Sequence, residues 1–250
     1  MYYPSRRSVP LGVLPRLGIV ALFAFILTGC GGGDSPTPSG PTPPPPPAPP
    51  PPPPASRPLG VAITPDGAFG YVTNNRSFTV SVIATASNTV VATVGVGSAP
   101  GVVAITPDGA FAYVTHDNFP GTASVIATAS NTVVATVPVD EGGAAGVAIT
   151  PDGAFAYVAN ANNAGRVSVI ETASNTVVAT VGVGNFPVGV AITPDGAFAY
   201  VPNFNSVFSE PFVNTVSVIE TASNTVVATV PIGGEGPTLW RSPRTGRSPT

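Results

Sequence analysis

Carboxylates are the side chains of this 250-residue chain whose spacing could carry chemistry. Four aspartates stand 42 to 44 residues apart in the same Pro-Asp-Gly context: Asp66, Asp108, Asp152 and Asp195. Paired carboxylates can act as general acid and base, or bind a cation, where the fold brings them together. Proline, aspartate and glycine in this order also form a tight turn. Because each aspartate belongs to a separate copy of a longer repeat, we assign all four to turns.

Other residue types that catalysis and metal binding use are scarce. The chain has one histidine, His116, and one cysteine, Cys30. His116 stands where other copies of the repeat have asparagine, so we expect it to form a hydrogen bond at a loop. Asp117, Asp140 and Glu141 could hold Ca²⁺ only if their loops converged. Neither a phosphate-binding glycine loop nor a Gly-x-Ser-x-Gly elbow occurs, so we predict no cofactor and no catalytic residue.

The charge of the chain argues against nucleic acid as a partner. There are 12 acidic residues and 9 basic ones, a formal net charge of −3, and every basic residue is an arginine. Within the repeats the arginines are Arg76 and Arg166. A net acidic domain repels phosphates. We therefore expect no binding to DNA or RNA.

The elements that position these residues repeat four times. Each copy reads VAITPDGAF(A/G)YV, then a variable gap, then TASNTVVATV. In the first copy, β-rich runs at 60–64, 68–74, 79–83 and 89–94 are separated by turn residues or by the variable gap. Four strands joined in this way predict one antiparallel sheet per copy. This period, in strand-forming sequence, is typical of propeller blades.

The strand composition predicts how the sheets pack. Valine, threonine, alanine and isoleucine occur on both faces of the strands, and few charges fall within them. A sheet with one wet face would alternate apolar and polar residues strictly. We therefore expect neighbouring sheets to cover both faces of each one. The predicted fold is an all-β propeller of four-stranded antiparallel blades, with four blades between residues 59 and 237.

A family resemblance appears at Tyr71-Val72-Thr73-Asn74. Together with the PDG turn before it and the SNTVVATV strand after it, this run resembles the YVTN-type β-propeller repeat of bacterial and archaeal surface proteins. The later copies read YVTH, YVAN and YVPN. Members of that family usually have about seven blades, within the range seen for propellers. The resemblance therefore implies a propeller truncated to four visible blades.

Residues 238–250 depart from the repeat. Residues 240–250 read WRSPRTGRSPT, and codons exist for this run that translate in a neighbouring frame as VAITPDGAFAY, the start of the repeat. We interpret the tail as a frameshifted fifth repeat, either natural or a sequencing error. The alternative is a genuine basic tail.

Four blades that do not close would expose an apolar face and a free edge at each end. Three outcomes would relieve this exposure. The four blades could close into a ring, two chains could pair as a homodimer of eight blades, or the product could be unstable and degraded. The sequence favours none of the three.

Function is expected on the connections that differ between copies. In an up-and-down sheet, connections alternate between two ends, so the PDG and ASN turns share one face and the variable connections share the other. Binding residues usually lie on loops held by a rigid scaffold. The candidate binding residues are Asn75, Arg76, Phe78, His116, Asp117, Asn118, Phe119, Asn162, Asn163, Arg166, Phe204, Phe208, Glu210 and Phe212.

The longest variable connection lies in the fourth copy and reads NFNSVFSEPFVN. It places Phe204, Phe208 and Phe212 near Glu210. Exposed aromatic side chains on a protruding loop suggest contact with a protein or carbohydrate partner. In the alternative interpretation, these phenylalanines fold back over the sheet as a local cap.

The N-terminus predicts export. Arg6, Arg7 and Arg16 precede an uncharged apolar run from Leu17 to Leu27. A bilayer-spanning helix needs about 20 apolar residues. The shorter run here fits the apolar core of a cleaved leader.

Leu27-Thr28-Gly29-Cys30 resembles the lipobox of bacterial lipoproteins. The resemblance implies that residues 1–29 are a signal peptide, that Cys30 is acylated, and that the lipid anchors the protein to the bacterial cell envelope. The anchored protein would face the periplasm or the cell exterior. A chance cysteine at the end of an ordinary signal is the alternative. In the lipoprotein interpretation, residues 30–58 are a linker between the lipid and the blades. Its proline-rich run 41–54 extends for about 43 Å as polyproline II.

Together these features predict a non-catalytic cell-envelope lipoprotein that displays a β-propeller for protein or ligand recognition. One alternative is a propeller enzyme, a hydrolase or a quinone-dependent dehydrogenase. The innermost strands read GVAIT, however, and offer a central channel almost no ionisable group. Another alternative is a truncated product without function.

Overall fold

The computed structural model describes residues 56–204 and 214–232, which fold as strands, turns and loops. The chain divides into residues 1–50 and 51–250, and all described residues lie in the second unit. The predicted signal peptide, Cys30, most of the linker and the tail lie outside the described residues, as do Phe208, Glu210 and Phe212. Within the described ranges, no helix is long and apolar enough to cross a membrane.

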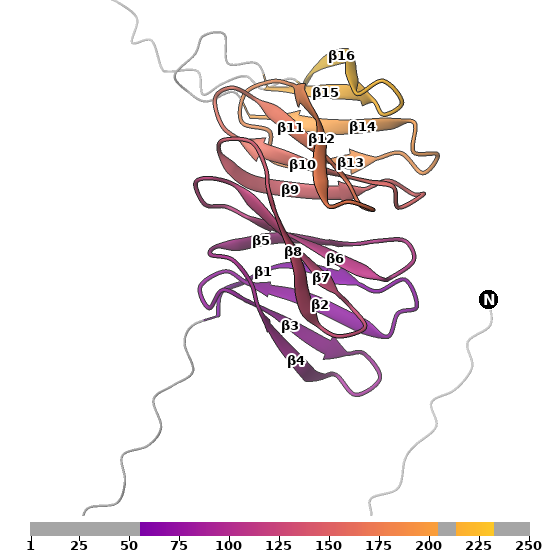
Figure 1. Ribbon diagram of the computed structural model, residues 1–250. Helices are drawn as coiled ribbons and strands as arrows, with labels where there is room; N and C mark the ends of the chain where they lie inside the picture. Colours follow the sequence, from indigo (N-terminus) through magenta and orange to yellow (C-terminus); the bar gives the residue numbers. More distant parts are fainter. Residues whose placement is uncertain (1–55, 205–213, 233–250) are drawn as a thin grey trace, which may run out of the picture. The chain divides into compact units, whose positions relative to one another are not determined.

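Four antiparallel sheets follow one another along the chain, and in each sheet every strand pairs with the next in sequence (Figure 1). We number these sheets as blades 1 to 4. Blade 1 contains β1 (Pro58–Ile63), β2 (Phe69–Asn74), β3 (Thr79–Ala84) and β4 (Thr89–Gly95). Blade 2 contains β5 (Pro100–Ile105), β6 (Phe111–His116), β7 (Thr122–Ala127) and β8 (Thr132–Pro138). Blade 3 contains β9 (Gly143–Ile149), β10 (Phe155–Ala161), β11 (Arg166–Glu171) and β12 (Thr176–Gly182). Blade 4 contains β13 (Ala191–Ile192), β14 (Phe198–Asn203), β15 (Asn214–Glu220) and β16 (Thr225–Ile232). The predicted all-β fold of four-stranded blades is confirmed.

The same Thr-Pro-Asp-Gly turn joins the first two strands of every blade. In blade 1, Thr64 Oγ1 donates to Asp66 Oδ1 over 2.5 Å, and Ala68 N donates to the same oxygen over 2.9 Å. These bonds, the Thr64 bond first, lower the pKa of Asp66. Gly67 adopts a φ of 72°, which a residue without Cβ reaches without steric cost. The same contacts recur in the other blades, which confirms the assignment of the aspartates to turns.

Neighbouring PDG turns also touch each other. The proline of one blade covers the glycine of the next, so that a Cβ on that glycine would lie 3.2 to 3.4 Å from the proline ring. The pairs are Pro65 with Gly109, Pro107 with Gly153, and Pro151 with Gly196. The turns therefore help to hold adjacent blades in register.

Three apolar clusters hold the blades together, one at each junction between neighbours. The forward face of a blade presents a tyrosine from its second strand, two small apolar residues from its third and a valine from its fourth. In blade 1 these are Tyr71, Val80, Val82 and Val94. Against this face packs the rear face of the next blade, which contributes a valine from its first strand, two apolar residues from its second and an isoleucine from its third. In blade 2 these are Val103, Ala112, Val114 and Ile126.

A hydrogen bond crosses each junction from the forward-face tyrosine. The acceptor is the asparagine of the ASN turn in the next blade, and each bond measures 2.7 Å: Tyr71 to Asn131, Tyr113 to Asn175, and Tyr157 to Asn224. Burial raises the pKa of all three phenols, that of Tyr113 to about 12, so each hydroxyl keeps the proton that it donates. We term this contact the tyrosine–asparagine bond.

Inner strands of adjacent blades approach closely, and outer strands do not. A Cβ on Gly60 would lie 2.6 Å from the Gly101 carbonyl oxygen, and one on Gly146 would lie 2.7 Å from the Gly189 Cα. The blades therefore converge at their first strands and separate toward their fourth, as in a propeller.

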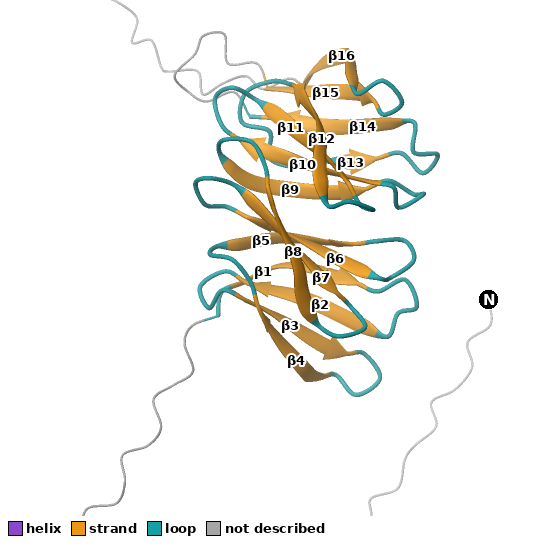
Figure 2. Cartoon of the chain, in the orientation of Figure 1, coloured by secondary structure: helices purple, strands orange, loops and turns teal. Residues whose placement is uncertain are grey.

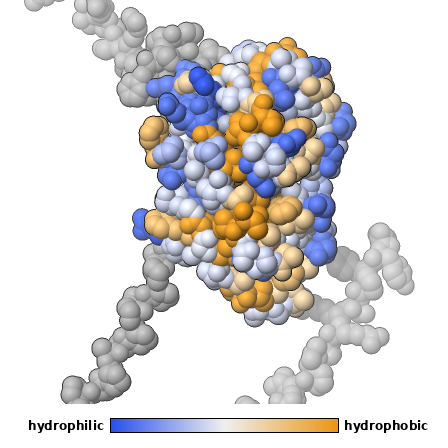
Figure 3. Space-filling view, viewed as in Figure 1, coloured by the Kyte–Doolittle hydropathy of each residue, from blue (hydrophilic) through white to orange (hydrophobic). Residues whose placement is uncertain are grey.

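The outer strands depart from the predicted burial on both faces. Their second valines, Val91, Val134, Val178 and Val227, are all 50 to 53% exposed, in inner and end blades alike. Figure 3 shows the resulting apolar band over β4, β8, β12 and β16. Because the blades separate toward the outside, a neighbouring sheet does not reach these side chains.

Candidate functional site

The connections gather at two opposite ends of the strands (Figure 2). The PDG and ASN turns lie at one end. Backbone bonds join the variable connections at the other: Phe186 N donates to the Asn162 carbonyl over 2.9 Å, and Phe204 N donates to the Phe186 carbonyl over 3.1 Å. We term this second end the loop face, formed by residues 75–78, 96–99, 117–121, 139–142, 162–165, 183–186 and Phe204.

A row of buried polar side chains lies at the base of the loop face. These residues occupy the last or last-but-one position of the second strands, and each bonds the central serine of the third strand. The side-chain pairs are Asn74 with Ser81 at 2.8 Å, His116 with Ser124 at 2.8 Å, Asn160 with Ser168 at 2.9 Å, and Asn203 with Ser217 at 2.9 Å. The row ties the loop face to the strands below it.

His116 is a member of this row and is not a surface residue. It was expected among the binding residues, but it is the last residue of β6 and its side chain is fully buried. Its Nδ1 lies 3.2 Å from the Ser98 carbonyl oxygen, and a Cβ on Gly97 would lie 3.1 Å from the ring. Burial lowers the pKa of His116. The expected hydrogen-bonding role is present, and a direct role in binding at the surface is not.

The parent protein should lose stability at mildly acidic pH because of His116. Replacing His116 by asparagine, the residue that the other three copies have there, should abolish this pH dependence. Because the folded pKa lies below the unfolded value of 6.5, the contribution of the neutral ring is complete above that pH. It is lost as the pH falls through the folded pKa. Between about pH 7 and pH 5.5, Tm should therefore fall more steeply for the parent than for His116→Asn. Parallel Tm curves from circular dichroism would contradict this.

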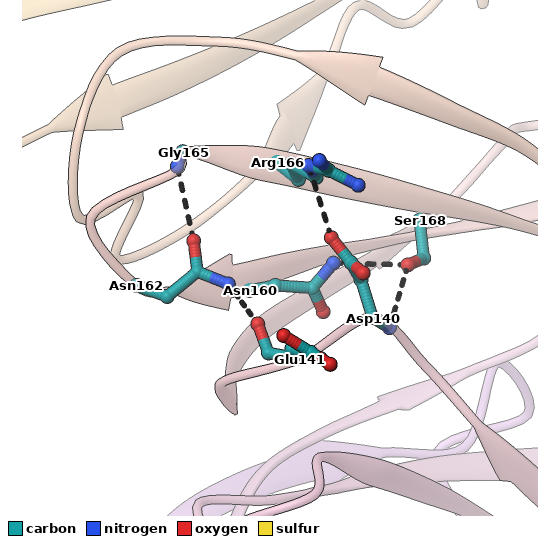
Figure 4. A network of polar contacts seen from close by, with 7 residues as sticks. All are labelled: Asp140, Glu141, Asn160, Asn162, Gly165, Arg166 and Ser168. Carbon is teal, nitrogen blue, oxygen red and sulfur yellow. Dashed lines mark hydrogen bonds and ion pairs between the residues drawn. The ribbon is translucent and has the colours of Figure 1, made fainter.

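A polar network on the loop face joins the connection between blades 2 and 3 to blade 3 (Figure 4). Arg166 Nε lies 3.3 Å from Asp140 Oδ2. The Asn162 side chain donates to the Glu141 carbonyl and accepts from Gly165 N over 3.0 Å. A partly exposed ion pair of this kind contributes about 0 to 1 kcal/mol. The network therefore orders the two connections more than it stabilises the fold.

The acidic residues considered for Ca²⁺ do not converge. Asp140 faces Arg166, and the Asp117 carboxylate lies against Gly143. Across 56–204 and 214–232, no group of three or more histidine, cysteine, aspartate and glutamate side chains is placed to hold a metal ion.

The remaining polar candidates occupy the rim of the loop face. Arg76 and Asn163 are exposed. Asn75 Nδ2 donates to the Pro100 carbonyl over 3.2 Å, so it joins blade 1 to blade 2. Asn118 Nδ2 donates to Ser98 Oγ over 2.9 Å, while its Oδ1 has no partner in the described part of the chain.

Exposed phenylalanines are the most prominent apolar groups of the loop face. Phe78, Phe119 and Phe204 are all exposed, Phe119 to 77%. Phe78 has a φ of 57° and occupies the place of Gly165, whose φ is 54°. In both blades the carbonyl at this place accepts from the valine after the fourth strand. A bulky residue in this left-handed region is uncommon and strained.

Phe186 lies beside these phenylalanines on the loop face but is only partly exposed, and it was not among the predicted residues. It lies between Asn162 and Phe204, to which its amide and carbonyl are bonded. Its φ is 46°. The signal was present in the sequence, because GVGNFPVG is the one connection between blades that contains an aromatic residue.

Two shallow pockets lie at the opposite end, between neighbouring PDG turns. One, of about 180 Å³, is lined in part by Asp108 and Asp152, and the other, of about 230 Å³, by Asp152 and Asp195. Threonine and backbone bonds lower the pKa of these carboxyls. A carboxylate with a lowered pKa is a poor proton acceptor at neutral pH. The carboxyls that line the pockets are thus the same ones that hold the turns together.

No protein-family model and no curated protein matches the chain. Among solved structures, the chain is similar to Kuenenia stuttgartiensis hydrazine synthase, a β-propeller-containing protein, with 28% sequence identity and a TM-score of 0.67. The match covers 72% of this chain and 50% of that chain. This chain therefore matches half the length of that structure. Together with the four antiparallel blades, the likeness shows a propeller-like fold.

Proposed function

We propose that the chain is a cell-envelope lipoprotein whose propeller recognises a protein or carbohydrate partner through the loop face, without catalysis. One observation carries this proposal: a strained and exposed Phe78 on the same face as Phe119 and Phe204. Glycine at position 78 would be free of strain, as at Gly165. A large aromatic side chain held there at an energetic cost is best explained by a contact outside the chain.

The loop face suits recognition because its backbone is ordered before binding. The connections are bonded to one another and to the buried polar row beneath them. Ordering in advance reduces the entropy lost on binding. Aromatic side chains contribute much contact area with few rotatable bonds. Asp140 and Arg166 add polar groups beside them.

The described titratable groups with shifted pKa values have structural partners. The four aspartates bond the threonines of their turns, three tyrosines bond asparagines, and His116 bonds Ser124. A catalytic acid or base needs a pKa near the operating pH together with access to a substrate. This pattern supports a role in binding.

A second candidate function comes from the likeness to hydrazine synthase, a protein named as an enzyme. In that alternative, the blades would form part of an enzyme. The likeness extends over half of that chain at 28% identity, so the match is limited to part of that enzyme. Turnover by the purified chain that survives removal of the loop-face phenylalanines would favour the alternative.

The experiment replaces residue 119 by a photoreactive phenylalanine analogue in cells that make the full chain. We expect cross-linked adducts to a specific protein or glycan after irradiation, because Phe119 is the most exposed of the three side chains. The matched control carries the analogue at Val134, which is also exposed but lies on the outer strand of the same blade. Equal adducts from both sites, or none from either, would contradict the proposal.

The same cells can carry Phe78→Gly to separate binding from stability. Because glycine relieves the left-handed strain at this position, the variant should keep its Tm. The yield of adducts from position 119 should nevertheless fall by about tenfold if Phe78 contributes the roughly 1.4 kcal/mol that corresponds to that factor.

A further inference from the structure

The tyrosine–asparagine bonds between blades leave one donor unused at blade 4 and one acceptor unused at blade 1. The three tyrosine–asparagine bonds use the tyrosines of blades 1 to 3 and the asparagines of blades 2 to 4. The remaining donor is Tyr200 of blade 4, and the remaining acceptor is Asn88 in the ASN turn of blade 1. Neither side chain has a hydrogen-bond partner among the described residues.

The forward face of blade 4 is built like the three that are covered. Tyr200 takes the place of tyrosines that are 0 to 1% exposed, yet it is itself 44% exposed. Val230 is 45% exposed, whereas the equivalent valines, Val94, Val137 and Val181, are 2 to 5% exposed. The residues that would pack against a following blade are therefore present and uncovered.

The rear face of blade 1 shows the complementary pattern. Val61 is 67% exposed, whereas its equivalents Val103 and Val147 are 5% and 7% exposed. A Cβ on Gly67 would meet nothing within 4 Å, although the equivalent glycines all contact the proline of a preceding blade. Pro194 is the proline of blade 4 that has no following glycine to cover.

We propose that a second copy of this chain covers both faces, with the forward face of blade 4 in one copy packing against the rear face of blade 1 in the other. Tyr200 then donates to Asn88 of the second copy, and Pro194 covers its Gly67. Both faces are exposed in the single chain, so its own two ends do not meet. Within the 250-residue sequence, the other three ASN-turn asparagines already have tyrosine donors.

A second copy is favoured over an unrelated partner because it satisfies every unused contact at once. Two chains joined head to tail form two identical junctions and eight blades, which lies within the range of known propellers. A head-to-tail contact gives a closed ring when the rotation closes. Association of the two end faces does not depend on what the loop face binds.

The test compares the full chain with Val61→Arg and Val230→Arg by native mass spectrometry from detergent. Each substitution places a charge on one end face at a side chain that is already exposed, so the fold should be retained. We expect the parent to be a dimer and each variant alone to be a monomer. An equimolar mixture should give a one-to-one heterodimer held by one of the two junctions, because that junction joins the two faces that remain unsubstituted. Val134→Arg, exposed in blade 2 and distant from both ends, is the matched control and should stay a dimer.

Each other outcome overturns the proposal. A monomeric parent would show that the end faces do not associate. A dimer that persists in either variant would indicate a like-to-like contact or association through the lipid. A ladder of larger species in the parent would overturn the closed dimer of eight blades, even if both variants abolish it.

The hydrogen bond has a test of its own. Tyr200→Phe should raise the dimer dissociation constant by roughly 5-fold to 150-fold, since two bonds of ordinary strength are lost per dimer. Tyr113→Phe removes an equivalent bond within one chain and should leave the dissociation constant unchanged. Equal effects of the two substitutions would assign Tyr200 a merely structural role.

Discussion

Replacing Tyr113 by alanine should lower the free energy of unfolding by about 3 to 5 kcal/mol, the range for deleting a buried aromatic ring. The ring is fully buried between blades 2 and 3, where it packs with Val125 and Val158. Its hydroxyl crosses the junction to Asn175. The substitution therefore leaves a cavity and removes a bond between two blades. Urea unfolding followed by circular dichroism measures the loss.

The repeat supplies a matched control for this prediction. Tyr200 has the same sequence context in blade 4, but its side chain is 44% exposed and its hydroxyl has no partner in the described ranges. Tyr200→Ala should therefore cost less than about 1 kcal/mol when the chain is kept dilute enough to be monomeric. Tyr113→Phe, which removes the bond alone, should cost about 1 kcal/mol. Similar losses for Tyr113→Ala and Tyr200→Ala would mean that the junctions do not carry the stability.

Replacing Cys30 by serine is expected to abolish acylation and to move the protein out of the membrane fraction. In the proposed lipoprotein this cysteine would accept several acyl chains, and several chains hold a protein firmly where one does not. A hydroxyl cannot replace the thiol that becomes the lipid-bearing thioether. Incorporation of radiolabelled palmitate and partition into a detergent phase should both fall to background.

A displaced thiol is the control for Cys30. In the double variant Cys30→Ser, Ser35→Cys, the chain keeps a cysteine five residues further along, outside the lipobox. We expect no palmitate incorporation into this variant. Label on it, or unchanged label on Cys30→Ser, would show that acylation does not depend on the LTGC context.

The fold could be predicted because its signals are local and occur four times. The first-copy strands were predicted at 60–64, 68–74, 79–83 and 89–94, and β1 to β4 differ from these bounds by at most two residues. The turns follow from proline, aspartate and glycine within three positions. Repetition shows which residues belong to the scaffold and which connections vary.

The contacts between blades could not be predicted in the same way. Tyr71 and Asn131 are 60 residues apart, and nothing local marks them as partners. The exposure of the valines in the fourth strands also depends on how far those strands lie from the first strands, where the blades converge. The sequence repeat, which is the same in every blade, does not specify that distance. His116 was expected to form a hydrogen bond at a loop and was counted among the candidate binding residues. Its complete burial depends on packing around the ring, which the local sequence does not specify.

Each blade carries a donor for the blade ahead of it and an acceptor for the blade behind. Insertion or deletion of one complete unit therefore leaves every remaining contact between blades intact. Because the copies are nearly identical in sequence, unequal crossing-over within the gene can change the number of units in one step. The length of such a protein can thus evolve by duplication without any redesign of its interior.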